Sequence, residues 1–151
     1  MNKAIGFTLL LALFLSGCSG VRIGSSFTGA VPEIAAHGIS KDAAERMAEL
    51  YPPGHTSLYL THPAEGNRQS GSVAFGNSFE NNLRSKGFRI APSIGSATPQ
   101  VSWTVDALGD ADPPSWYLQL KVLDESGART ISRVYDGQGV PQGGYAEGRI
   151  E

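Results

Sequence analysis

The first regular pattern of apolar and polar positions along the chain has a helical period. It lies in residues 40–51, SKDAAERMAELY, where apolar side chains recur three or four residues apart and charged ones between them face solvent. Ser40 is a favourable N-cap residue, and Pro52 disfavours a helical conformation at Tyr51. The pattern therefore predicts a helix that begins at Ser40 and ends near Tyr51.

A second helical pattern follows in residues 73–87, VAFGNSFENNLRSKG. Phe75, Phe79 and Leu83 recur every four residues and so share one face of the predicted helix. Gly87 comes at the end of this pattern, where a glycine commonly ends a helix in the left-handed conformation. The polar segment at 61–72 predicts a loop before this helix.

In the C-terminal half of the chain, apolar residues recur at every second position. Residues 101–108, VSWTVDAL, and 116–123, WYLQLKVL, alternate apolar and polar positions, as strands with one buried face do. The segment DESG at 124–127 predicts a tight turn, from which 128–135 returns as the partner strand. Shorter strands are expected at 55–60, at 88–90 and, as an edge strand, near 144–150.

The elements are therefore expected in the order helix, strand, helix, strand and antiparallel meander. This order favours an α+β fold, with two helices packed on one face of a mostly antiparallel sheet. We expect a single domain over residues 40–151. Residues 18–39 are rich in Gly, Ser and Ala and predict a flexible tether ahead of it.

The first 17 residues have the composition of a secretory signal peptide. Lys3 provides a positive start, and the apolar run at 4–15 is shorter than the roughly 20 residues that cross a membrane. The sequence LSGC at 15–18 then follows the lipobox of bacterial lipoproteins, in which the cysteine thiol accepts a diacylglyceryl group. An ordinary cleaved signal with a chance cysteine, or an uncleaved apolar N-terminus, are the alternatives.

Cys18 is the only cysteine among the 151 residues, so one molecule cannot form an internal disulfide. We expect Cys18 to be the lipid attachment site, whose acyl chains (palmitate among them) anchor the mature protein to a membrane. Ser19 follows, in place of the Asp that commonly retains lipoproteins in the inner membrane. The expected location is the cell envelope, at the outer membrane and facing the periplasm.

Removal of the signal changes the charge only slightly. One of the 12 basic residues, Lys3, is lost and none of the 14 acidic ones, so the mature chain has a formal charge near −3. Without an excess of basic residues, direct nucleic-acid binding is not expected.

Several polar residues were candidates for chemistry. His37, His55 and His62 lack the spacing and the further ligand that a zinc site needs, and are expected in loops. The acidic segment at 106–114, DALGDADPP, is too sparse for a calcium loop and predicts a polar connection between strands. No metal or other cofactor is therefore expected.

No nucleophile elbow and no Walker loop occurs, so we do not expect an enzyme. A hydrolase whose site is assembled in space without a motif is the weaker alternative. Trp103 and Trp116 are in phase with the apolar faces of their strands and are expected in the core. Tyr117 points the other way and is the candidate surface contact.

Segments in both halves of the chain resemble the TrbH family, small lipoproteins of conjugal plasmid transfer systems. They are AAERMAELYPPGHTSLYL, FENNLRSKGFRIAP and the closing SRVYDGQG and GGY, together with the lipobox. The resemblance covers most of residues 40–146. It implies a role in mating-pair formation, within the type IV secretion apparatus that carries DNA from donor to recipient. It carries over one functional position, the acylated Cys18, and no catalytic residues.

These observations predict a non-enzymatic, membrane-anchored lipoprotein that supports assembly or stability of a conjugation apparatus. Its expected partners are the membrane, through acylated Cys18, and other envelope or secretion-channel proteins. The exposed face of the sheet, or strand addition at its glycine-rich C-terminal edge, would make the protein contact. The alternative is a general envelope lipoprotein that binds a small ligand or a cell-wall component and has no link to conjugation.

Overall fold

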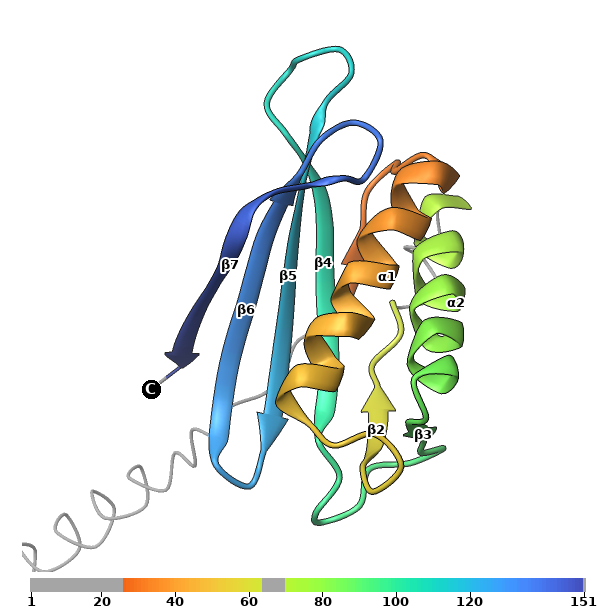
Figure 1. Ribbon diagram of the computed structural model, residues 1–151, viewed down its shortest axis with the longest axis vertical. Helices are drawn as coiled ribbons and strands as arrows, with labels where there is room; N and C mark the ends of the chain where they lie inside the picture. Colours follow the sequence, from red (N-terminus) through yellow and green to blue (C-terminus); the bar gives the residue numbers. More distant parts are fainter. Residues whose placement is uncertain (1–25, 64–69, 151) are drawn as a thin grey trace, which may run out of the picture.

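The computed structural model describes residues 26–63 and 70–150. In these ranges the chain forms two helices and one seven-stranded sheet, with both helices on the same face of the sheet (Figure 1). The predicted fold class is confirmed. The elements are β1 (Phe27–Thr28), α1 (Glu33–Leu50), β2 (Ser57–Leu60), α2 (Ser70–Ser85), β3 (Arg89–Ile90), β4 (Gln100–Leu108), β5 (Ser115–Asp124), β6 (Gly127–Tyr135) and β7 (Pro141–Ile150).

The sheet combines an antiparallel meander with three short parallel strands. Its order is β3-β2-β4-β5-β6-β7, and β1 pairs with β4 further along the edge that β2 also uses. Strands β4 to β7 are antiparallel neighbours, as predicted. The pairs β1–β4, β2–β4 and β2–β3 are parallel, because α1 and α2 carry the chain back along the sheet before the next strand begins.

The core lies between the helix pair and the sheet. Trp103 of β4 is fully enclosed, and the rings of Phe75 and Phe79 from α2 lie 5.7 and 5.9 Å from its ring. Trp116 is buried as well, so both tryptophans occupy the predicted core. The predicted apolar faces are confirmed for Phe75, Phe79 and Leu83 in α2, for Val101, Trp103 and Val105 in β4, and for Trp116, Leu118, Leu120 and Val122 in β5.

The folded region begins earlier than the sequence pattern predicts. The tether prediction for 18–39 is wrong from residue 26 onward, because 26–39 contain β1 and the first two turns of α1. Ser40 is not a helix cap: it lies inside α1, and its hydroxyl donates to the Ser78 hydroxyl at 2.7 Å. The early turns give a weak helical pattern because they include Ala35, Ala36 and Gly38, and alanine and glycine contribute little hydrophobic period.

Gly38 interrupts the helical pattern for a packing reason. The loop between β6 and β7 crosses α1 at this point, and a Cβ added to Gly38 would lie 2.6 Å from the Gly139 carbonyl oxygen. Gly139 has a φ of +82°, and a Cβ there would lie 2.5 Å from the carbonyl oxygen of Ala35. The two glycines therefore let the backbones of the loop and the helix touch.

Other element boundaries differ from the predictions by a few residues. Helix α2 begins at Ser70, inside the predicted loop 61–72, of which residues 64–69 lie outside the described part. Gly87 ends α2 with a φ of +99°, as predicted. The tip of the β4–β5 hairpin extends beyond the helices (Figure 1), so Ala107 is exposed although it is in phase with the buried face.

Candidate functional site

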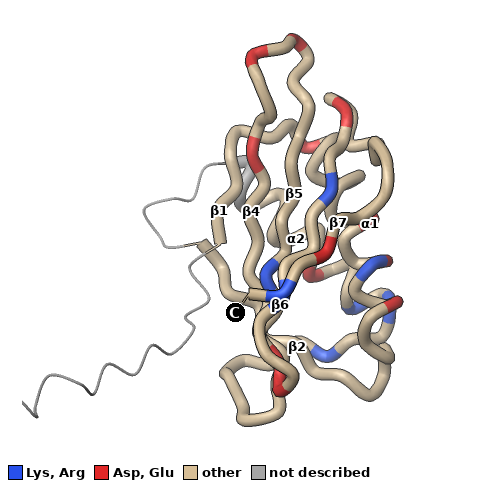
Figure 2. The backbone as a smooth tube through the Cα atoms, turned by 90° about the vertical axis from the view of Figure 1, so that its left-hand side faces the viewer, with Lys and Arg blue, Asp and Glu red and all other residues tan. Residues whose placement is uncertain are grey.

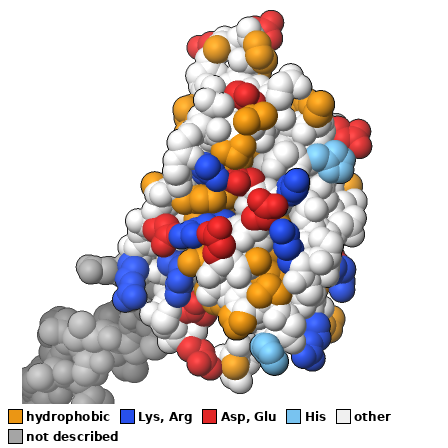
Figure 3. Space-filling view, viewed as in Figure 1, with side chains coloured by type: hydrophobic (Ala, Val, Ile, Leu, Met, Phe, Trp, Pro, Cys, Tyr) orange, Lys and Arg blue, Asp and Glu red, His pale blue; other side chains and the backbone are white. Residues whose placement is uncertain are grey.

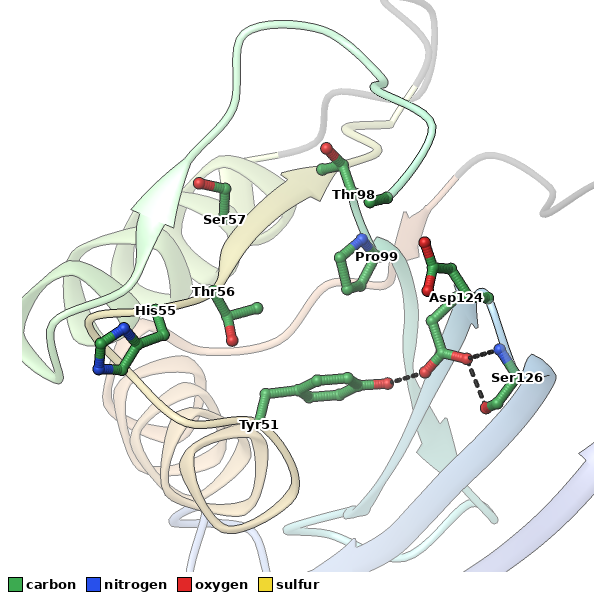
Figure 4. A pocket seen from close by; sticks show the side chains of 10 residues that line it. Tyr51, His55, Thr56, Ser57, Thr98, Pro99, Asp124 and Ser126 are labelled. Atoms are coloured by element: carbon green, nitrogen blue, oxygen red, sulfur yellow. Dashed lines mark hydrogen bonds between the residues drawn. The ribbon is translucent and has the colours of Figure 1, made fainter.

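A cavity of about 500 Å³ lies at the end of the molecule where α1 meets β2 (Figure 4). The end of α1 and the following loop form one side of it, and the loop before β4 and the β5–β6 turn form the other. Its lining residues are Tyr51, His55, Thr56, Ser57, Ala97, Thr98, Pro99, Asp124, Glu125 and Ser126.

The carboxylate of Asp124 organises one wall of this cavity. The Tyr51 hydroxyl donates to its Oδ2 at 2.5 Å, and Arg129 donates to the same oxygen at 3.2 Å. The backbone N–H and the hydroxyl of Ser126 both donate to Oδ1, at 2.8 and 2.6 Å (Figure 4). The hydrogen bond from Tyr51 ties the β5–β6 turn to the end of α1, and the other three lie within the β5–β6 hairpin.

The same contacts determine the charge states of the wall. Burial raises the pKa of Asp124, but the hydrogen bonds from Ser126 and Tyr51 and the charge of Arg129 outweigh it and hold the pKa below its usual value. Burial and the hydrogen bond to Asp124 raise the pKa of Tyr51 above the usual range. At neutral pH the pair is therefore a carboxylate and a neutral phenol.

Other side chains of the cavity are free to meet a ligand. His55, Ser57, Thr98 and Glu125 line it and make no side-chain hydrogen bond to any residue in 26–63 or 70–150. They present an imidazole, two hydroxyls and a carboxylate, a set that suits a small polar molecule. In the described part of the chain, no three His, Cys, Asp or Glu side chains are grouped closely enough to hold a metal ion.

A second polar cluster, the α1–β7 network, connects the first helix to the last strand. Its centre is Asp42 of α1, whose carboxylate accepts hydrogen bonds from Arg133 at 2.9 and 3.1 Å. The hydroxyls of Tyr135 and Tyr145 donate to the same carboxylate at 2.6 and 2.5 Å. Three strand side chains therefore converge on one helix residue.

Arg46 extends the α1–β7 network by one helical turn. It forms ion pairs with Glu147 of β7 and, at 2.5 Å, with Glu49 of α1. The guanidinium carbons of Arg46 and Arg133 lie 5.5 and 4.7 Å from the centre of the Tyr145 ring. Figure 3 shows acidic and basic side chains gathered beside α1 on this side of the molecule. The network holds the outer strand of the sheet to the helix layer.

Burial raises the pKa values of the two tyrosines in this network. The neighbouring Tyr145 and the hydrogen bond to Asp42 raise the pKa of Tyr135 further. The hydrogen bond to Asp42 likewise raises the pKa of Tyr145 further. Burial lowers the pKa of Arg133, but the Asp42 carboxylate outweighs this and raises it overall. The network is therefore a neutral phenol pair beside an ion pair.

The residues singled out from sequence lie elsewhere. Cys18 is outside the described residues, so its lipidation remains a prediction. Tyr117 is half-buried on the sheet face opposite to the helices, where its hydroxyl oxygen accepts a hydrogen bond from Gln119 at 3.2 Å. It faces Asp106 and Val134 on the neighbouring strands and contacts neither the cavity nor the α1–β7 network.

The three histidines do not come together. His55 and His62 lie outside helices and strands, as expected, and only His55 reaches the cavity. The loop prediction for His37 is wrong, because α1 includes it, and its Nδ1 lies 2.8 Å from the Ser78 hydroxyl. The acidic segment 106–114 forms the end of β4 and the exposed connection to β5, as predicted.

Sequence reasoning missed both polar clusters. Asp42 is one of the helix residues expected to face solvent, yet its side chain is only 17% exposed because Arg133 covers it. The sequence predicts Asp124 only as part of a turn and Tyr51 only as the end of a helix. No local pattern marks these residues, because their partners come from distant strands.

Within the described part of the chain, no helix has both the length and the apolar character that a membrane span requires. A family model described as conjugal transfer protein TrbH matches residues 22–147. The match extends over both helices and over all strands up to Glu147 in β7. No curated protein and no solved structure matches the chain.

Proposed function

Because this chain belongs to the TrbH family of conjugal transfer proteins, we propose that it is a lipid-anchored, non-enzymatic envelope component that supports assembly or stability of the conjugation apparatus. The family match over residues 22–147 is the observation that carries the proposal. The lipobox at 15–18 supports the anchor, with Cys18 as the acylated residue.

The position of the first described strand supports close attachment to a membrane. Ser26 lies eight residues after Cys18, and eight extended residues span at most about 28 Å. Ser26 is tied to the fold, since its hydroxyl donates to the Thr61 carbonyl oxygen and accepts a hydrogen bond from the Trp103 N–H at 3.0 Å. An acylated Cys18 would therefore keep β1 within about 28 Å of the lipid surface.

In this proposal the domain contributes by its position at the envelope, where it contacts other proteins, and does not catalyse a reaction. Two or more acyl chains on one residue give stable anchoring, because each buried CH₂ contributes about 0.8 kcal/mol. Confinement to the membrane raises the effective concentration of the domain near other envelope proteins of the apparatus. Ser19 after the acylated cysteine favours the outer membrane, facing the periplasm.

Transfer frequency from a donor that lacks the gene tests the proposal. Wild type should restore transfer, and Cys18→Ser, which removes the acyl acceptor, should fail to restore it at equal protein level. Ser19→Ala is the matched control, because it changes the next residue and keeps the cysteine. Membrane fractionation should place wild type with the membranes and Cys18→Ser outside them. Normal transfer without the gene, or full complementation by Cys18→Ser, would contradict the proposal.

The cavity favours a second candidate function, binding of a small polar ligand or a cell-wall component. Its free imidazole, carboxylate and hydroxyls support this reading. Binding to isolated cell-wall fragments should then be lost in His55→Ala and Glu125→Gln. Retained binding in both variants would exclude the cavity as the site.

A further inference from the structure

Strand β7 presents an open edge. It is the last strand in the sheet order, and no other described strand pairs with its outer side. Figure 2 views the molecule from this side, with β7 toward the reader. Natural sheets usually protect such edges with proline, bulges or repelling charges, because an unpaired edge accepts a further strand through main-chain hydrogen bonds.

The protection of this edge is confined to the first part of β7. Pro141 begins the strand, Gly143 has a φ of +86°, and the pairing with β6 shifts register between Ser132 and Val134. From Ala146 to Ile150 the pairing is regular, and this part contains no proline. Its charged residues, Glu147 and Arg149, have opposite signs, so they do not repel a second copy of the same segment.

Arg149 lacks a partner of opposite charge in the described part of the chain. Its neighbour across the ladder is Arg129, and like charges in directly opposed positions are unfavourable. Arg129 is itself paired with Asp124 at 3.2 Å, whereas Arg149 forms no ion pair with any residue in 26–63 or 70–150. The edge therefore carries an exposed cation two residues from Glu147, whose side chain is 42% exposed.

We propose that β7 pairs with β7 of a second copy, in antiparallel orientation about a two-fold axis at Gly148. In this register Glu147 of each copy lies opposite Arg149 of the other, and both pairs fall on the face that carries the helices. Ala146 and Ile150 of the two copies meet on the opposite face, beside Ala128. A two-fold axis at Glu147 would instead place Glu147 against itself.

The α1–β7 network prepares the edge for this pairing. The hydrogen bond from Tyr145 to Asp42 and the ion pair between Glu147 and Arg46 hold the strand on α1. Pairing therefore orders few additional residues, which lowers its entropic cost. Because the axis is perpendicular to the sheet, the helices of both copies remain on one face of a continuous sheet. The pairing does not depend on the conjugal role or on lipidation.

Disulfide trapping in the full-length protein tests the axis. Gly148→Cys places the thiols of two copies directly opposite each other, where Cβ atoms are about 5 Å apart. Mild oxidation should then give a covalent dimer. Gly144→Cys is the matched control, because a Cβ there meets nothing within 4 Å and the two thiols would be roughly 27 Å apart. Wild type, with Cys18 as its one cysteine, sets the background.

Charge reversal in the Gly148→Cys background tests the two ion pairs between Glu147 of one copy and Arg149 of the other. Arg149→Glu should reduce the rate of dimer trapping about tenfold, because two attractive pairs become repulsive. Adding Glu147→Arg restores opposite charges across the axis and should recover part of the trapping, because it also removes the ion pair with Arg46. Equal trapping of Gly144→Cys and Gly148→Cys, an unchanged rate in Arg149→Glu, or a covalent product with a different protein would overturn the self-pairing.

Discussion

Tyr145 and Asp42 are joined by a hydrogen bond of 2.5 Å, although they are 103 positions apart in the chain. The bond connects the last strand of the sheet to the first helix. Strand β7 is therefore held by the helix layer as well as by its ladder to β6, and the stability of the outer strand depends on a residue near the start of the domain.

Removal of one hydroxyl tests this connection. Tyr145→Phe keeps the ring between Arg46 and Arg133 but loses the hydrogen bond to Asp42, and should lower the free energy of unfolding by about 1 kcal/mol. Urea unfolding measures the change. Tyr117→Phe is the matched control, because its half-exposed hydroxyl accepts only from Gln119 among the described residues, and it should cost less than about 0.5 kcal/mol.

Asp42→Ala should be the more severe change. It leaves Arg133 and the fully buried Tyr135 without their shared acceptor, and should cost roughly 2–3 kcal/mol of unfolding free energy. Glu45→Ala on the same helix removes an exposed ion pair with Lys86 and should cost less than about 0.5 kcal/mol. Equal effects in the two variants, measured by denaturant titration, would show that the α1–β7 network does not stabilise the fold.

Gly38→Ala should reverse the usual effect of this substitution in a helix. Alanine ordinarily stabilises a helix interior by about 1 kcal/mol over glycine, but here the new Cβ would lie 2.6 Å from the Gly139 carbonyl oxygen. We expect a lower melting temperature. Gly76→Ala in α2 is the control, because its Cβ comes no closer than 3.4 Å to Trp103, so this variant should be as stable as wild type or more so.

The lowered pKa of Asp124, in the wall of the cavity, leads us to expect a loss of stability in acid. The pKa of Asp124 is lower in the folded protein than in the unfolded chain, where it is about 4. The stabilisation is therefore present above about pH 4 and is lost as the pH falls toward the folded-state pKa. Asp124→Asn should be less stable than wild type near neutral pH, with a smaller difference at about pH 3. A constant difference in unfolding free energy across this range would contradict the assignment.

Three tyrosines with raised pKa values, one fully buried and two half-buried, lead us to expect a loss of stability in alkali. The pKa values of Tyr51, Tyr135 and Tyr145 are raised in the folded protein, so above about pH 10 the unfolded chain ionises where the folded one does not. Unfolding free energy should therefore fall between about pH 9 and pH 11. Tyr145→Phe removes one of the three groups and should make this fall smaller. An equal fall in the variant would mean that Tyr145 does not contribute.

Much of the architecture could be read from the sequence, because it depends on neighbours along the chain. Phe75, Phe79 and Leu83 recur with the helical period, and the alternation around Trp103 and Trp116 marks the two central strands. These periods follow from the geometry of helix and strand, so any core that covers one face imposes them. The family resemblance is likewise a property of the sequence itself.

What the tertiary structure decided concerns residues whose partners are distant in the chain. From the sequence, Asp42 is predicted to be a solvent-facing helix residue. In the structure, the antiparallel strands place Arg133 and Tyr145 against it. The sequence predicts a tether where the first turns of α1 lie, because Gly38 weakens the helical pattern there. Only the β6–β7 loop, which packs against α1 at this point, explains why the residue is a glycine. Local periods report which face of an element is apolar. Which polar groups become buried, and which strand edge stays open, depends on the elements that pack there.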